Sequence, residues 1–147
     1  MTDIQECKRI LAENPFAVYL GIELLAVETG HVLAQIKNRE KLHNIYGDVH
    51  GGALYSVADN LAGIAAASCG YYVTTVNGSI QYLKAVRGLE CVRCEAKVIK
   101  AGKTISSVHV DIRDEEGNLY NTAEFTYFNL KPKKDGEDNW TSTALRK

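Results

Sequence analysis

The chain has 147 residues, of which 46% are hydrophobic, which is the usual size and composition of one domain with its own buried core. Its formal net charge of -1, without a long run of one sign, excludes a broad electrostatic attraction to nucleic acid or to an anionic membrane. It contains no apolar run of membrane-spanning length and no secretory leader, so we expect a cytoplasmic protein that does not enter a membrane. The expected partners are small molecules and other copies of the chain.

The first half of the chain predicts a helix, a hairpin and a second helix. Apolar residues recur at helical spacing in residues 1–16, and we interpret this segment as one N-terminal helix. Residues 22–36 alternate in polarity on both sides of a Gly30 turn, which is typical of a β-hairpin. Residues 51–68 predict a long helix that is apolar on nearly all sides, and such a helix is normally enclosed.

The second half predicts strands and a polar tail. Four alternating runs with short turns between them, at residues 71–83, 89–100, 103–113 and 119–130, favour an antiparallel meander of three or four strands. Residues 131–147 are polar and without period, so we expect a flexible end. The order of elements predicts an α+β fold over residues 1–147, in which a curved antiparallel sheet of about six strands wraps one long central helix.

The cysteines do not form a convincing metal site. Cys91 and Cys94 are spaced like half of a zinc or redox motif, but no second pair and no nearby histidine completes a ligand set. In a strand, two residues three apart point to opposite faces of the sheet. We therefore expect reduced thiols and no bound metal.

The start of the long helix is a candidate oxyanion site. The first N–H groups of a helix have no partner within the helix, and glycine lets a substrate approach them closely. Gly51 and Gly52 can therefore supply donors of the kind that stabilise an oxyanion, or they can merely permit a tight turn into the helix. His50, just before them, can cap the helix or hold the loop.

Asp59 is the second candidate on this helix. It is either an ordinary solvated acid or, given its small apolar neighbours, a covered carboxylate suited to general-base or nucleophilic chemistry. From His50 to Asp59 a helix spans about 13 Å, which is too far for the Gly51 amide and the Asp59 carboxylate to hold one carbonyl between them. If both serve one reaction, they must come from two chains, which predicts a homodimer.

These residues resemble the motif of a known family. Asn44, Gly47, the run from His50 to Gly52, and then Asp59 and Gly63 are similar to the pattern of hotdog-fold acyl-CoA thioesterases of the PaaI and 4-hydroxybenzoyl-CoA thioesterase type. Downstream, residues 74–86 and 100–128 resemble the later strands of that family. The resemblance covers roughly residues 17–130 and implies the hotdog fold.

The resemblance also implies an activity and a site. Members hydrolyse an acyl-CoA thioester to a carboxylic acid and coenzyme A without a metal or cofactor. Coenzyme A enters as part of the substrate. Asp59 would be the nucleophile or general base of one subunit, and Gly51 would give the oxyanion amide of the other, with His50 shaping its turn. Asn44 would orient the thioester or the water, and Thr75 would help to position water.

Coenzyme A phosphates require cations at the mouth of such a site. The stretch after Tyr82 lacks the Arg-Pro that relatives often carry, so the wall of the pantetheine channel is expected to differ. The candidate cations are Lys84, Arg87, Lys100 and Lys103. The expected substrate-binding set is completed by Gly52, Tyr82 and Thr104.

Two other functions are compatible with a hotdog fold. A non-catalytic binder of acyl-CoA or acyl carriers would keep the cleft but would not need Asp59 in it. A dehydratase or hydratase typically pairs a histidine with an acid, whereas His50 directly precedes the glycines. The sequence therefore favours a thioesterase that assembles as a dimer, and further as a tetramer of paired dimers.

Overall fold

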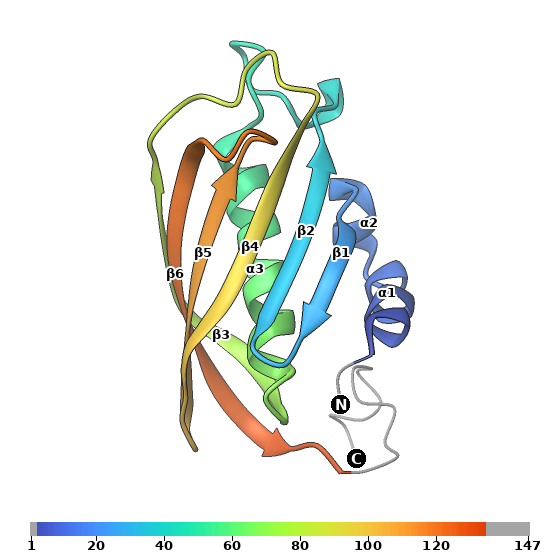
Figure 1. The fold of residues 1–147 in the computed structure, drawn as a ribbon, viewed down its shortest axis with the longest axis vertical. Helices are drawn as coiled ribbons and strands as arrows, with labels where there is room; N and C mark the ends of the chain where they lie inside the picture. The colour runs from blue at the N-terminus through green and yellow to red at the C-terminus, as the bar shows by residue number, and fades with distance from the viewer. Residues whose placement is uncertain (1–2, 135–147) are drawn as a thin grey trace.

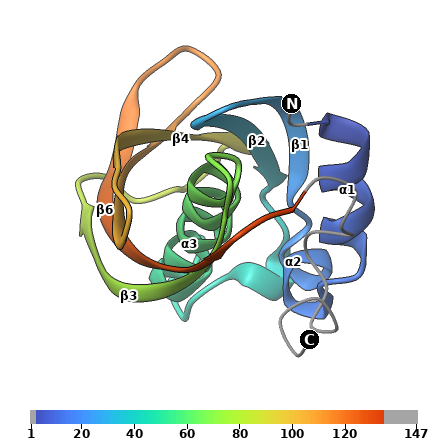
Figure 2. The same ribbon diagram turned by 90° about the horizontal axis from the view of Figure 1, so that it is seen from below.

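The computed structural model describes residues 3–134, which form one curved antiparallel sheet around a central helix (Figures 1 and 2). The helix, α3 (Gly51–Ala67), lies in the hollow of the sheet and contacts β2 (His31–Lys37), β3 (Tyr71–Tyr82), β4 (Cys91–Ala101), β5 (Ile105–Arg113) and β6 (Leu119–Pro132). The predicted α+β hotdog fold with six strands is confirmed. Of the tail predicted to be flexible at residues 131–147, residues 131 and 132 instead belong to β6 and pair with β3, and the residues from 135 onward lie outside the described part of the chain.

The strand order is β1-β2-β4-β5-β6-β3, where β1 is Glu23–Glu28. The hairpin of β1 and β2 and the meander of β4, β5 and β6 are antiparallel, as predicted. The meander has three strands, the lower of the two numbers predicted, because β3 pairs with β6 at the far edge of the sheet. The link from residue 83 to residue 90 crosses the start of α3, where Val49 N–H donates to the carbonyl of the buried Val86. Both β1 and β3 are therefore edge strands.

The N-terminal segment forms two helices rather than the one predicted for residues 1–16. Helix α1 (Ile4–Ala12) is followed at once by α2 (Pro15–Leu20), and both lie beside β1 (Figure 2). Asn14 caps α2 by accepting a hydrogen bond from Ala17 N–H, and Pro15 occupies its first turn. Proline ends one helix but is favoured in the first turn of the next, which explains why the pattern looked like a stop. A short 3₁₀ helix, Glu40–Leu42, precedes the loop that leads into α3.

The inner face of β3 lies close to α3 at Gly78. Gly78 of β3 is required for this approach, because a Cβ there would lie 2.3 Å from the Tyr55 hydroxyl and 2.5 Å from the Phe125 ring. Tyr55 and Phe125 also pack on each other, with ring centroids 5.3 Å apart. The α3 side chains enclosed by these contacts are Leu54, Val57, Ala58, Leu61, Ala62, Ala65, Ala66 and Ala67.

The cysteines lie as the strand pattern predicted. Cys94 is buried on the inner face of β4, whereas Cys91 is half-buried and its thiol donates to Glu115 on the other side. No cysteine within residues 3–134 forms a disulfide. In the same part of the chain, no helix is long and apolar enough to cross a membrane.

Candidate active site

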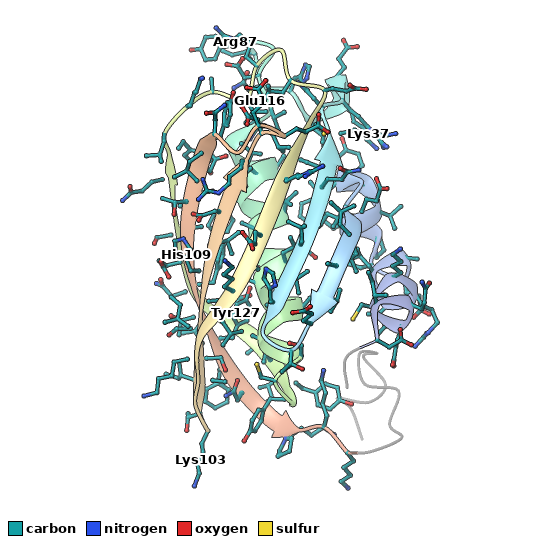
Figure 3. The ribbon with its side chains drawn as sticks, in the orientation of Figure 1. Lys37, Arg87, Lys103, His109, Glu116 and Tyr127 are labelled. Carbon is teal, nitrogen blue, oxygen red and sulfur yellow. The ribbon has the colours of Figure 1, made fainter. Side chains whose placement is uncertain are left out.

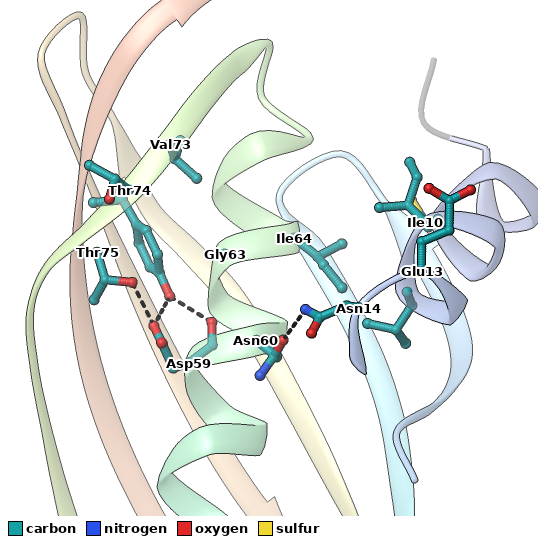
Figure 4. A pocket seen from close by; sticks show the side chains of 13 residues that line it. Ile10, Glu13, Asn14, Asp59, Asn60, Gly63, Ile64, Val73, Thr74 and Thr75 are labelled. Carbon is teal, nitrogen blue, oxygen red and sulfur yellow. Dashed lines mark hydrogen bonds between the residues drawn. The ribbon is translucent and has the colours of Figure 1, made fainter. Parts of the chain in front are cut away.

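Asp59 lies on the side of α3 that the sheet leaves open (Figure 4). Two hydroxyl groups donate to the same carboxylate oxygen, Oδ1: Thr75 Oγ1 at 2.9 Å and the Tyr127 hydroxyl at 2.6 Å. The second oxygen, Oδ2, has no donor among residues 3–134. The carboxylate is thus oriented through one oxygen, and the other remains available.

Tyr127 was not identified in the sequence. It is the residue of β6 paired with Thr75 of β3, so the two side chains share one face of the sheet and converge on Asp59. Tyr127 is 2% exposed, and burial, together with the Asp59 charge, raises the pKa of its phenol, so the group stays protonated and remains a donor. The available signal was the alternation of β6, which places this tyrosine inside, where its hydroxyl needs a partner.

A cleft of about 580 Å³ opens beside Asp59. Its floor is α3, and its two walls are β3 and α1, so it runs across the part of the helix that the sheet does not cover (Figure 4). Asp59 and Glu13 are its acidic residues, and no lysine or arginine lines it among the described residues. The other lining residues are Cys7, Ile10, Leu11, Asn14, Asn60, Gly63, Ile64, Val73, Thr74, Thr75 and Tyr127.

The start of α3 forms a second cluster. His50 is the N-cap, and its Nδ1 accepts a hydrogen bond from Gly52 N–H at 2.8 Å. This bond requires Nδ1 to be unprotonated and uses the Gly52 amide, while the Gly51 N–H has no acceptor within residues 3–134. Tyr82, at the end of β3, donates to the Gly51 carbonyl at 2.7 Å. Of the two glycine amides predicted to bind substrate, only that of Gly51 is therefore free to do so.

The two clusters are separate within one chain. Helix α3 is uninterrupted from Gly51 to Ala67, so eight steps of about 1.5 Å place the Gly51 amide about 12 Å from Asp59 along the axis. The structure therefore brings Thr75 and Tyr127 to Asp59, and His50 and Tyr82 to Gly51.

The loop before α3 uses two of the predicted site residues for its own conformation. Asn44 Oδ1 accepts hydrogen bonds from Tyr46 N–H and Asp48 N–H, which leaves only the Nδ2 group of Asn44 to reach a substrate. Arg87 donates to both oxygens of the buried Asp48, at 2.6 and 2.8 Å. The Arg87 guanidinium is therefore already bound to a carboxylate at the position where we expected it to bind phosphate.

The predicted cations do not gather at one mouth in one chain. Arg87 lies at the end of the sheet near the start of α3, and Lys103 lies at the opposite end (Figure 3). Lys84 is near Arg87 in sequence and sits over the Tyr120 ring, with Nζ 5.1 Å from the centroid. Lys100 and Thr104 belong to the same end as Lys103, in and after β4. Within one chain, the two groups of candidate cations therefore flank opposite ends of the long strands.

The described residues offer no metal centre. Within residues 3–134, no group of three or more histidine, cysteine, aspartate and glutamate side chains is arranged to hold a metal ion. The polar groups that line the cleft are two carboxylates, three hydroxyls, two side-chain amides and a thiol, which suit binding and proton transfer.

Comparison with known proteins identifies the class to which this fold and site belong. The sequence model of the thioesterase superfamily matches residues 46–120, and the chain belongs to that superfamily. It is a thioester hydrolase with a hotdog fold. The matched residues include Gly51, Asp59 and Thr75.

Individual relatives agree with this assignment. A 1,4-dihydroxy-2-naphthoyl-CoA hydrolase of Listeria monocytogenes is 30% identical over 112 residues, which is 68% of this chain and 83% of the relative. Human acyl-coenzyme A thioesterase 13 is 26% identical over 117 residues, 78% of each chain. Among solved structures, a hypothetical thioesterase of Streptococcus pneumoniae with coenzyme A has a TM-score of 0.73 at 31% identity, covering 77% of this chain and 91% of that one. The Escherichia coli PaaI protein shares the fold, with a TM-score of 0.82 at 19% identity over 88% of this chain and 94% of that one.

The ion pair between Arg87 and Asp48 predicts a pH-dependent stability. Hydrogen bonding from Arg87 holds the pKa of the Asp48 carboxyl below its usual value, so the pair stabilises the fold above about pH 4, and that contribution is lost as the pH falls through the lowered pKa. We expect Arg87→Gln to be less stable than wild type in urea unfolding at about pH 7, with a smaller difference at about pH 3. Adding Asp48→Asn to the variant is the control, because it removes the carboxylate left without its partner. A difference that is equal at both pH values would contradict the assignment.

Proposed function

We propose that the chain hydrolyses acyl-CoA thioesters to a carboxylic acid and coenzyme A, with Asp59 as the reacting group. The observation that carries the proposal is the Asp59 carboxylate, held at Oδ1 by Thr75 and Tyr127 at the edge of an open cleft, with Oδ2 unpaired. The relatives that act on or bind CoA compounds support this substrate class, since one is an acyl-coenzyme A thioesterase and another was solved with coenzyme A.

Two chemical routes are open to this carboxylate. In one, Oδ2 attacks the thioester carbonyl carbon, the C–S bond breaks, coenzyme A leaves as the thiolate, and water hydrolyses the resulting anhydride. In the other, Oδ2 takes a proton from water as that water attacks the carbonyl. Both routes place negative charge on the carbonyl oxygen, and a free N–H at the start of a helix is suited to stabilise it. In the proposal, this donor is the Gly51 amide of a partner chain.

The sheet has an edge at which such a partner can bind. β3 is a twelve-residue edge strand, and unpaired edges of this length invite pairing with another chain. Exposed apolar side chains also lie on and just after it: Val76 at 59%, Tyr82 at 52% and Leu83 at 54% exposure. Antiparallel pairing of two β3 strands about a two-fold axis would cover both the edge and these side chains.

The contacts between β3 and α3 indicate where that axis would lie. Thr75 marks the Asp59 half of the site, and Tyr82 marks the Gly51 half. Gly78 contacts Tyr55, which lies midway between Gly51 and Asp59 on α3. An axis near Gly78 would place Thr75 of one chain opposite the Tyr82 position of the other. The Gly51 amide would then face Asp59, and each dimer would contain two complete sites.

With the same axis, the end of the sheet that carries Lys84 in one chain would lie beside the end that carries Lys103 in the other chain. Lys103 of one chain would then lie on the same side of the dimer as Lys84 of the other, although the two lie at opposite ends within one chain. We propose these two lysines, with Thr104, as the ligands of the CoA phosphates, because Arg87 is bound to Asp48.

The function is tested with a panel of acetyl-, hexanoyl-, dodecanoyl- and benzoyl-CoA, followed by the release of free thiol. We expect wild type to turn over at least one of them, and Asp59→Asn to lose at least about 100-fold in kcat, because the general base or nucleophile is gone. Equal rates for the two proteins would show that Asp59 is not the reacting group. Tight binding of all four esters without thiol release by wild type would identify a binding protein instead.

The two-chain site predicts complementation between inactive variants. Asp59→Asn removes the acid, and Gly51→Pro removes the amide donor while keeping a residue favoured at the start of a helix. Each variant alone should be inactive. A refolded equal mixture should regain about a quarter of wild-type activity, because half of the dimers are mixed and each of those has one intact site.

The controls for complementation distinguish the loss of the Gly51 N–H donor from the steric effect of a side chain at that position. Gly51→Ala keeps the N–H but also places a Cβ against the Tyr82 ring, so it measures the steric effect alone. If the site is complete within one chain, the mixture will show no recovery.

Tyr127→Phe tests the positioning of Asp59. The variant removes one charge-assisted hydrogen bond to Oδ1, so we expect kcat to fall by about tenfold or more while KM changes little. Tyr71→Phe, near the start of the same β3 strand as Thr75, is the matched control and should leave kcat unchanged. A change in KM alone, or an unchanged kcat in a folded variant, would argue against this role.

A further inference from the structure

We infer that the cleft beyond Asp59 is the acyl-binding site, that the chain's own helix α1 is its far wall, and that Gly63 sets the size of the acyl group that enters. The inference rests on the proposed function and concerns the substrate that this same site selects. Three observations carry it. Packing does not require a glycine at position 63, apolar residues line part of the cleft, and contacts within the chain hold α1 in place.

Gly63 is a helical glycine that packing does not require. It lies four residues after Asp59, hence on the same side of α3, and it lines the cleft. A Cβ at Gly63 would lie 3.6 Å from the Tyr127 ring, which is ordinary contact, whereas at Gly78 it would lie 2.3 Å from a hydroxyl. Glycine inside a helix costs about 1 kcal/mol relative to alanine. In the inferred acyl site, the absence of a side chain at Gly63 leaves room in the cleft for the acyl group.

The cleft has apolar lining residues on three elements, beside its polar ones. They are Ile64 on α3, Val73 on β3, and Cys7, Ile10 and Leu11 on α1. Asp59 and Glu13 are the only charged lining residues among those described, and Glu13 is paired with Arg9 at 2.9 Å. A second carboxylate on the acyl group would be buried without a cation, which is unfavourable. The cleft therefore suits uncharged, hydrophobic acyl groups.

Helix α1 is held on the fold by its buried face, and the residue just after it contacts the floor of the cleft. Cys7 and Leu11 are buried in the core, and Asn14, just after the helix, donates from Nδ2 to Asn60 Oδ1 at 3.3 Å. Asn60 is the neighbour of Asp59 and in turn donates to the Ser56 carbonyl. The distance from the reacting carboxylate to the far wall is thus set by contacts within one chain.

The experiment measures kcat/KM of wild type, Gly63→Ala, Gly63→Leu and the double variant Gly63→Leu/Ile10→Ala with acetyl-, butyryl-, succinyl- and dodecanoyl-CoA. Gly63→Leu should lower kcat/KM for dodecanoyl-CoA by at least about tenfold more than for acetyl-CoA, because the leucine fills the cleft. Gly63→Ala should also lower kcat/KM more for dodecanoyl-CoA than for acetyl-CoA, but by less than Gly63→Leu does. In the double variant, Ile10→Ala should restore part of the kcat/KM lost for dodecanoyl-CoA, because it makes space at the opposite wall. Wild type should prefer butyryl-CoA to succinyl-CoA by at least about tenfold.

Lys8→Ala is the matched control on α1, because Lys8 does not line the cleft, and it should leave all four values unchanged. Circular dichroism and the thermal midpoint establish that each variant is folded. An equal loss with every ester in folded Gly63→Leu, or equal use of succinyl- and butyryl-CoA by wild type, would overturn the inference.

A failure of the proposed function gives a different result. If wild type releases no thiol from any ester, hydrolysis is refuted, and titration calorimetry with the same esters still decides the acyl site. Weaker binding of dodecanoyl-CoA, but not of acetyl-CoA, to Gly63→Leu supports the site, and equal binding to both proteins overturns it.

Discussion

The enclosure of α3 by the sheet constrains the positions of all other parts of the molecule. The helix is rich in alanine, so the strands can approach it closely, and Ala58, Leu61, Ala62 and Ala65 have no exposed surface. A charged side chain on such a helix has room only on the side where the sheet stops. Asp59 occupies that side, and the edge strand β3 provides Thr75 as its first hydrogen-bond donor.

The two ends of the proposed reaction are built independently of one another. At Asp59, neutral hydroxyls from two paired strands meet a carboxylate, so the charge is oriented without being neutralised by a cation. At Gly51, a histidine cap takes the neighbouring amide, and the ion pair of Asp48 with Arg87 holds the preceding loop. Each half is held by its own hydrogen bonds, and in the proposed dimer the position of one half relative to the other depends on how two chains pair.

Much of the fold could be predicted from the sequence because periodicity reports burial. The limits of α3, the hairpin and the closing strands follow from that periodicity, as does the α+β architecture. The neighbour of β3 could not be found this way, because alternation shows which face of a strand is buried but not which strand lies beside it. Asn14 and Pro15 were misleading for a local reason, since the same two residues end α1 and begin α2.

The candidate site was predictable where spacing along one helix carries the information, as for Gly51 and Asp59. Tyr127 depends on the pairing of β6 with β3, and the partner of Arg87 depends on a loop 39 residues away in sequence. Long-range contacts of this kind leave no period in the sequence. These contacts determine that Tyr127 donates to Asp59 and that Arg87 is bound to Asp48.

The position of α1 has a consequence for how such a protein can diversify. The thioesterase match begins at residue 46, so it includes Asp59 and the start of α3 but not the helix that forms one side of the cleft. The carboxylate proposed to react and the wall facing it therefore belong to different stretches of chain, joined near Asp59 by an amide contact between Asn14 and Asn60. Under the proposed function, substitutions in the first twenty residues can reshape the cavity while the geometry around Asp59 stays fixed, so substrate preference can change from one descendant to another without loss of the reaction.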